Sequence, residues 1–291
     1  MRAASPAACM TAAARLLLAL SLLAAAAVRA APESLPVSTP VQAVRDLAYG
    51  GEPLEHIDAY VPLHPAGPVL LMVHGGAWAF GDKASAAMIR PKVAYWGARG
   101  YVVVSVNYPL LPAADPMEQA LDVARALALV QQKAASWGAD GQRVVLMGHS
   151  SGGHLVSLLN AAPRLAYAQG AKPWRGTVNL DGAALDVPEL MRARHAPLFD
   201  RAFGRDPAFW DSVSPLHVLQ RQPAPPPLLL VCSSLRGRSC PQAEALARKA
   251  TAWGHQVSVR AEPASHSEID RQLGLPGAYT DSVARWISSI L

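Results

Sequence analysis

The chain has 291 residues, 51% of them apolar, and a formal net charge of +5. Three arginines and no acid fall within residues 1–30, so residues 31–291 carry 23 basic against 21 acidic side chains, a formal charge of +2. No run of lysine or arginine remains there to favour nucleic acid or an anionic membrane as a partner. Length and apolar content allow one sizeable core, and we expect residues 31–291 to form a single domain.

The first 30 residues have the three parts of an export signal. Two arginines precede an apolar run at 16–28, which ends in the sequence Val-Arg-Ala. The run is 13 residues long, shorter than the ~20 residues that a stable membrane-spanning helix needs. We therefore expect cleavage after Ala30 and a periplasmic or secreted protein without stable membrane insertion. The alternative is a retained N-terminal anchor, and the sequence does not predict the oligomeric state.

Beyond residue 40, β-branched apolar runs alternate with longer segments of helical spacing. Expected strands lie at 41–49, 54–61, 68–73, 101–106, 143–147, 177–180, 228–232 and 256–261, and expected helices include 117–137, 151–159 and 241–253. We expect the first two strands to form an antiparallel hairpin. The alternation that follows predicts an α/β fold, a mostly parallel eight-stranded sheet with helices on both faces. Residues 187–222 interrupt the pattern and predict either a small cap or lid insertion or an ordinary connection.

The strongest chemical signal is the sequence Gly-His-Ser-Ser-Gly at 148–152, which directly follows an expected strand and directly precedes an expected helix. A serine on such a tight strand-to-helix turn is held in a strained conformation with its hydroxyl exposed at the sheet edge, and the glycines make room for the turn. This context predicts that Ser150 is a nucleophile. The alternative is a glycine-rich turn without chemistry.

A second glycine-rich segment, His-Gly-Gly-Ala-Trp at 74–78, follows the third expected strand. A serine that attacks a carbonyl needs donors for the oxyanion, and backbone amides of such a loop can approach closely. We expect the amides of Gly75 and Gly76 to supply them, together with the amide of Ser151 at the start of the next helix. His74 and Trp78 are expected to shape the loop.

The general base is expected to follow in the order serine, acid, histidine, and to lie at the carboxyl end of the sheet. His266 follows the eighth strand, whereas His255 precedes it and falls at the opposite edge. We therefore predict His266 as the base. The other histidines near these segments are expected to be structural or to belong to the insertion: His149, His154, His195 and His217.

Cys232 and Cys240 are the only cysteines beyond the expected signal, which contains Cys9. Disulfides persist in the compartments that exported proteins reach. Eight residues of separation permit a bridge, so we predict a disulfide between Cys232 and Cys240, with two buried free thiols as the alternative. No clustered cysteine or histidine ligands suggest a metal, and we expect neither a metal nor an organic cofactor.

From about residue 41 to its C-terminus, the sequence resembles the carboxylesterase and hormone-sensitive-lipase-like branch of the α/β-hydrolases. The resemblance rests on the H-G-G-x-W loop at 74–78, which kynurenine formamidases also have, and on G-H-S-S-G-G-H at 148–154. It implies the α/β-hydrolase fold and a serine carboxylesterase that acts on a small-molecule ester through an acyl-enzyme intermediate. The alternatives are an arylformamidase or amidase with the same site, and a catalytically degenerate hydrolase that acts as a binding protein.

The chain departs from this family in the triad acid. Family members usually have an aspartate a few residues beyond the seventh strand, but the corresponding loop at 232–240 contains no carboxylate. Some α/β-hydrolases use an acid after the sixth strand instead, and Asp181 stands there. We take Asp181 as the best substitute, while three other carboxylates stay open: Asp186, Glu262 and Glu268.

Overall fold

A computed structural model describes residues 40–182 and 184–291. The expected signal at 1–30 lies outside the described residues. None of the helices that are described is both long and apolar enough to cross a membrane.

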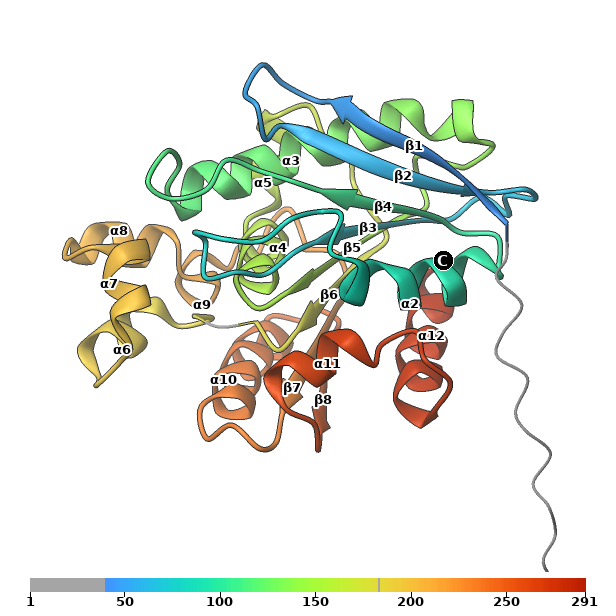
Figure 1. The fold of residues 1–291 in the computed structure, drawn as a ribbon. Coiled ribbons are helices and arrows are strands. Elements are labelled where there is room, and N and C mark those ends of the chain that lie inside the picture. Colours follow the sequence, from blue (N-terminus) through green and yellow to red (C-terminus); the bar gives the residue numbers. More distant parts are fainter. Residues whose placement is uncertain (1–39, 183) are drawn as a thin grey trace, which may run out of the picture. The chain divides into compact units, whose positions relative to one another are not determined.

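One sheet of eight strands forms the centre of the fold, in the order β1-β2-β4-β3-β5-β6-β7-β8 (Figure 1). β1 pairs with β2, and β2 with β4, in antiparallel orientation; all other neighbours are parallel. The strands are β1 (Val41–Ala48), β2 (His56–Pro62), β3 (Val69–Val73), β4 (Val102–Val106), β5 (Val144–His149), β6 (Gly176–Leu180), β7 (Leu228–Ser233) and β8 (Val257–Glu262). The predicted α/β fold is confirmed. β5 runs two residues further than expected and so reaches the residue before Ser150.

Helices cover both faces of the sheet. One face carries α3 (Pro116–Lys133), α4 (Ser151–Ala161) and α10 (Ser239–Ala252); the other carries α2 (Ala86–Gly97), α11 (His266–Arg271) and α12 (Ala278–Ile290). Alternate residues of β7 belong to the two layers: Leu228 and Leu230 pack with α10, and Leu229 and Val231 pack with α12. This is the period of two that a strand buried on both faces requires. Two short helical segments, η1 (Ala134–Trp137) and α5 (Pro163–Ala168), complete the first layer.

The sheet brings several loops to one edge. Strands β3 to β8 run in the same direction, so the loops that follow β3, β5, β6, β7 and β8 all leave the carboxyl edge. β3 has β4 on one side and β5 on the other, so the order of the strands reverses there. In open α/β sheets this reversal point is where ligands bind, beyond the carboxyl ends of the strands.

The predicted insertion at 187–222 consists of four short helices. They are α6 (Val187–Arg192), α7 (Pro197–Phe203), α8 (Pro207–Ser212) and α9 (Pro215–Val218). Trp78 of the glycine-rich loop packs on this segment, with its ring 4.9 Å from that of Phe203 and 5.9 Å from that of Phe199. His154 of α4 bonds through Nε2 to the carbonyl of Val213 at 2.7 Å. The insertion is thereby attached to the sheet layer, and its action as a lid stays a prediction.

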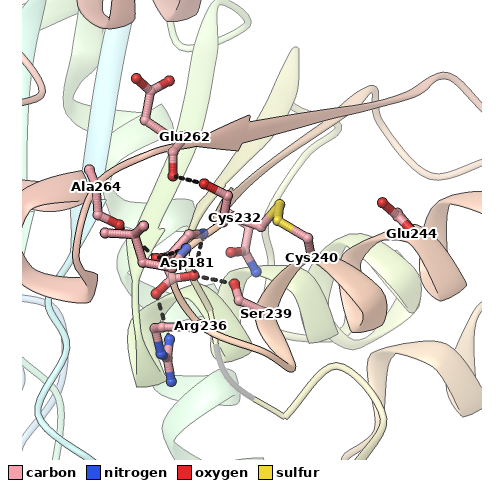
Figure 2. The surroundings of a disulfide bond; sticks show 12 residues. Asp181, Cys232, Arg236, Ser239, Cys240, Glu244, Glu262 and Ala264 are labelled. Atoms are coloured by element: carbon pink, nitrogen blue, oxygen red, sulfur yellow. Dashed lines mark hydrogen bonds and ion pairs between the residues drawn. A yellow bond between two sulfur atoms is a disulfide. The ribbon is translucent and has the colours of Figure 1, made fainter.

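The structure contains the predicted bond between Cys232 and Cys240, whose Cα atoms are 5.1 Å apart (Figure 2). It joins the end of strand β7 to the first turn of α10. The closed loop is the one from which the family's usual acid is missing, and it contains Arg236 and Ser239.

We expect reduction of this disulfide to lower the melting temperature. Closing a loop of this size removes about 2.5 kcal/mol of unfolded-chain freedom in the chain-entropy treatment, which corresponds to roughly 5–10 °C for a domain of this length. Thermal unfolding with and without a thiol reductant measures the shift. The variant Cys232→Ala/Cys240→Ala is the control, because its melting temperature should not respond to reductant; equal responses of the two proteins would contradict the prediction.

Candidate active site

Ser150 lies at the turn between β5 and α4, with φ 55° and ψ −119°. A positive φ at a residue with a side chain costs on the order of 1–3 kcal/mol and persists only where the surroundings fix it. Two hydrogen bonds do so: the Ser150 amide donates to the carbonyl of Leu180 at 3.1 Å, and the His154 amide donates to the carbonyl of Ser150 at 3.0 Å. The hydroxyl-bearing residue is thus held by the neighbouring strand and by its own helix.

The glycines of this turn are required by close backbone approaches. A Cβ added at Gly148 would lie 2.3 Å from the carbonyl oxygen of Gly152, and one added at Gly152 would lie 2.4 Å from the carbonyl oxygens of Val73 and His74. Such distances leave no space for any side chain. The glycines therefore let α4 begin directly against the end of β3, as the motif predicts.

His266 meets Ser150 across the carboxyl edge of the sheet. Its Nε2 lies 2.8 Å from the Ser150 hydroxyl oxygen. The loop that precedes it is held by the Ser233 hydroxyl, which donates to the carbonyl of Ala264 at 2.6 Å. His255 lies before β8, and its Nε2 is 2.9 Å from the carbonyl of Gln220. Of these two histidines, only His266 contacts Ser150.

His149 packs against the ring of His266 and bonds to its backbone. The two rings are 4.6 Å apart, and Nε2 of His149 donates to the carbonyl of His266 at 2.9 Å. On its other side, Nδ1 of His149 lies 3.7 Å from a carboxylate oxygen of Asp270, which forms a buried ion pair with Lys92 at 2.7 Å. Burial lowers the pKa of His149. A neutral imidazole with its proton on Nε2 makes the bond to the His266 carbonyl, while its unprotonated Nδ1 makes no hydrogen bond to Asp270. His149 therefore fixes the backbone of His266 rather than acting on Ser150.

Asp181 is the first residue after β6 and, like Ser150, has a positive φ, 49°. Its Oδ2 lies 2.6 Å from Nδ1 of His266. The structure therefore brings Ser150, His266 and Asp181 into one hydrogen-bonded series. A proton on Nδ1 that is donated to the carboxylate leaves Nε2 free to accept from the serine hydroxyl, which is the tautomer that a general base needs.

Several donors surround the Asp181 carboxylate, which is 1% exposed (Figure 2). Burial by itself raises the pKa of Asp181, but hydrogen bonds from His266, the Ser239 hydroxyl and the Ser233 amide, with the charge of Arg236, hold that pKa far below its ordinary value. The Ser233 amide donates at 2.8 Å, and Arg236 forms an ion pair with Oδ2. The carboxylate is therefore ionised throughout the neutral range.

The other three candidate acids have different partners. Glu262 pairs with Arg260 at 2.8 Å, and Glu268 accepts from the Ser265 amide at 2.8 Å in the first turn of α11. Asp186 caps α6 by accepting from the Glu189 amide at 3.0 Å. Within residues 40–182 and 184–291, Asp181 is the only carboxylate that bonds to the imidazole of His266.

Backbone amides face the same site. Gly75 and Gly76 follow β3, and no acceptor among the described residues takes the N–H of either one. A Cβ at Gly75 would lie 2.9 Å from the Cβ of Ser150, so this backbone runs directly beside the serine. Ser151 is the first residue of α4, where the N–H groups have no partner within the helix and the helix dipole favours negative charge.

Four of the residues described above line one cavity of about 690 Å³. Gly75, Gly76, Ser150 and His266 lie along it, and Phe199 of α7 forms part of its wall. The insertion thus contributes to the cavity that contains the serine. Trp78, which is 1% exposed, and the pair of His74 and Tyr108, whose rings stack 4.6 Å apart, support the glycine-rich loop as expected.

Arg236 is a site residue that the sequence analysis does not identify. Its Nη1 bonds to the Asp181 carboxylate and lies 3.0 Å from Nδ1 of His266. A signal existed, because the loop that lacks the family's aspartate contains two arginines, Arg236 and Arg238. Ser239, whose hydroxyl also bonds to Asp181, gives no comparable signal.

A family model and several known esterases are similar to parts of this chain. The BD-FAE family model matches residues 57–168, which include the glycine-rich loop and Ser150. A probable isoprenylcysteine alpha-carbonyl methylesterase of Oryza sativa subsp. japonica is 30% identical over 118 residues, which are 40% of this chain and 28% of that protein. Esterase LipC of Mycobacterium tuberculosis is 27% identical over 206 residues, 64% of this chain and 49% of that protein.

Among solved structures, that of esterase B from Lactobacillus rhamnosis is similar, with a TM-score of 0.71 and 21% identity over 96% of this chain and 93% of that one. At this identity the similarity establishes the fold. The chain spans only 28% and 49% of the length of the two curated relatives described above.

Asp181→Asn should destabilise the protein at neutral pH. A carboxyl group whose pKa is lowered on folding stabilises the folded state above its unfolded pKa of ~4, and this contribution is lost as the pH falls through the folded value. We expect the variant to lose about 2 kcal/mol at pH 7, typical of hydrogen bonds to a charged group, and the difference from wild type to narrow below pH ~4.

Urea unfolding of both proteins at a series of pH values measures this difference. Glu244→Gln on α10 is the control, because its exposed side chain is expected to change stability by less than about 0.5 kcal/mol. A difference between wild type and Asp181→Asn that does not change with pH would show that the effect comes from packing rather than from the charge.

Proposed function

We propose that the chain is a carboxylesterase-like α/β-hydrolase, and that it hydrolyses carboxylic esters of small molecules through an acyl-enzyme intermediate. One observation carries the proposal: the Ser150 hydroxyl is 2.8 Å from Nε2 of His266, whose Nδ1 is 2.6 Å from the buried carboxylate of Asp181. A nucleophile within hydrogen-bond reach of a base that a third group orients is the arrangement used for nucleophilic catalysis.

In the first half of the proposed reaction, the Ser150 oxygen attacks the ester carbonyl carbon and Nε2 of His266 takes the hydroxyl proton. The negative charge that develops on the carbonyl oxygen is stabilised by the amides of Gly75, Gly76 and Ser151. The C–O bond to the alcohol then breaks, and His266 returns the proton to the departing alkoxide. Asp181 stabilises the imidazolium that exists between these two proton transfers.

In the second half, water attacks the acyl-serine while His266 takes one of its protons. The tetrahedral intermediate again places its oxyanion at the same three amides. Breakage of the bond to the Ser150 oxygen releases the carboxylic acid, and the proton on His266 returns to the serine. The same groups therefore serve both halves, which is why a single preorganised set of donors suffices.

Ser150→Ala is the direct test. Turnover of a short p-nitrophenyl ester should fall by more than about 10³-fold, because the acyl-enzyme cannot form. Labelling by a fluorophosphonate probe should disappear, while thermal unfolding changes little. A wild-type protein that neither turns over the ester nor reacts with the probe would overturn the proposal and favour a binding protein. Faster cleavage of an N-formyl arylamine than of the ester would instead favour a formamidase.

Two histidine variants provide the matched control for this test. His266→Gln should lower turnover by about 10³-fold or more through loss of the base, whereas His255→Gln should leave it within a few-fold. His255 bonds to Gln220 and not to Ser150. Equal effects of the two substitutions would exclude His266 as the base.

We further propose that the protein is exported and that its signal is removed after Ala30. The disulfide supports this, because such bonds persist in oxidising compartments. The mature protein recovered from the periplasm or the medium of its own cells should have the mass of a chain that starts at Ala31. A full-length chain recovered with the membrane would contradict cleavage and favour the retained anchor.

A further inference from the structure

A second cavity, of about 290 Å³, lies beside the one that contains Ser150. Its walls are the segment from α6 to α7 and the loop that leads from β7 into α10. Three residues line both cavities: Ala196, Phe199 and Arg236. The two cavities are therefore neighbours with a shared wall, and a substrate whose ester group lies at Ser150 can extend toward the second one.

This second cavity is lined by three arginines, Arg194, Arg236 and Arg238, and by no carboxylate. We refer to it as the arginine pocket. Arg236 pairs with Asp181, but in the described part of the chain neither Arg194 nor Arg238 forms an ion pair. His195 also lines the pocket, and its Nε2 lies 3.1 Å from the carboxylate of Asp200.

The concentration of positive charge is not a property of the whole protein, because residues 31–291 have a formal charge of only +2. A single exposed arginine is usually just solvated, but here three converge on one concavity beside the catalytic groups. Ser239, the first residue of α10, is part of the same wall, so the positive end of that helix's dipole lies there too. Each of these features favours a negative charge in the pocket.

We propose that the arginine pocket is an anion subsite of the active site, and that the preferred substrates are esters which carry a carboxylate remote from the ester group. The proposal rests on the ester hydrolysis proposed above. Arg194 and Arg238, whose guanidinium groups have no protein carboxylate to bind, supply charge-assisted hydrogen bonds to the substrate anion. Arg236 lies at the junction of the two cavities.

The carboxylate could belong to the acyl part or to the alcohol part of the ester, and two pairs of substrates distinguish these. The first pair is p-nitrophenyl hydrogen adipate and its uncharged isostere p-nitrophenyl isooctanoate, which share a leaving group. The second pair is p-acetoxybenzoate and p-isopropylphenyl acetate, which share an acyl group. The ratio of kcat/KM for the charged and uncharged member of each pair reports selection for the anion.

The variants are Arg194→Gln, Arg238→Gln and the double variant, with Arg192→Gln as the control. Arg192 has the same charge and ends α6 two residues before Arg194, but it does not line the pocket. Arg236 is not used, because it contacts Asp181 and His266. Melting temperatures verify that each variant is folded.

Wild type should prefer the charged member of one pair by about 10-fold, as expected for partly exposed charge-assisted contacts. Each single substitution should lower kcat/KM for that substrate by about 5-fold, mainly through KM, and leave the uncharged partner within about 2-fold. Arg192→Gln should keep the wild-type ratio. If the uncharged esters are hydrolysed but the ratio of kcat/KM for charged and uncharged esters is the same in wild type and in the double variant, the anion subsite alone is overturned. Absence of all hydrolysis would overturn the proposed function, and the subsite with it.

Discussion

The buried carboxylate of Asp181 is the constraint around which the carboxyl edge of the sheet is organised. An ionised group that is 1% exposed is tolerated only when donors within the protein replace its hydration. Those donors come from the end of β7, the β7–α10 loop, the start of α10 and the start of α11. Displacing any one of these segments would leave a charge buried without sufficient partners, so the carboxylate and the loops stabilise one another.

The position of Asp181 directly after β6 has a structural consequence. β6 pairs directly with β5, so Asp181 and Ser150 follow adjacent strands, and the Ser150 amide bonds to the carbonyl of Leu180, the residue before Asp181. Both Ser150 and Asp181 have positive φ values, 55° and 49°. Two strained turns side by side store energy that the flanking sheet must offset, and β5 and β6 are buried along their whole length.

The loop after β7 contributes to the site although it contains no carboxylate. It supplies the Ser233 amide, Arg236 and the Ser239 hydroxyl, all of which donate to Asp181, and the disulfide closes it at its ends (Figure 2). In the usual family arrangement this loop supplies the carboxylate itself. Here it supplies two neutral donors and one cation, Arg236, to a carboxylate that follows another strand.

On the opposite side of the serine, a buried histidine holds the insertion against the glycine-rich loop. The indole of Trp78 donates to Nδ1 of His154 at 3.2 Å, while Nε2 of His154 donates to Val213. Both contacts require a neutral imidazole, and burial lowers the pKa of His154 to about 4. One buried histidine thereby links α4, the glycine-rich loop and the insertion, so a wall of the catalytic cavity is fixed through a residue outside it.

Most of the fold and part of the site follow from local pattern. Continuous β-branched runs predict the buried strands. The 148–152 motif predicts the position of Ser150, because strand, turn and helix are consecutive in sequence. The choice of His266 over His255 follows from chain order and strand direction. Asp181 required an inference about which strand ends are neighbours, and the sequence left three other carboxylates open.

The two arginines of the loop after β7 are a signal in the sequence, but the contacts that Arg236 makes do not follow from local pattern. Apolar periodicity predicts burial, and motifs predict local backbone geometry. Neither predicts which groups a long, half-exposed side chain contacts across two loops. What places its guanidinium against Asp181 is the path of a loop that a disulfide closes and a helix continues. Only the three-dimensional arrangement shows that Arg236, in the loop without a carboxylate, lines both the cavity that contains Ser150 and the arginine pocket beside it.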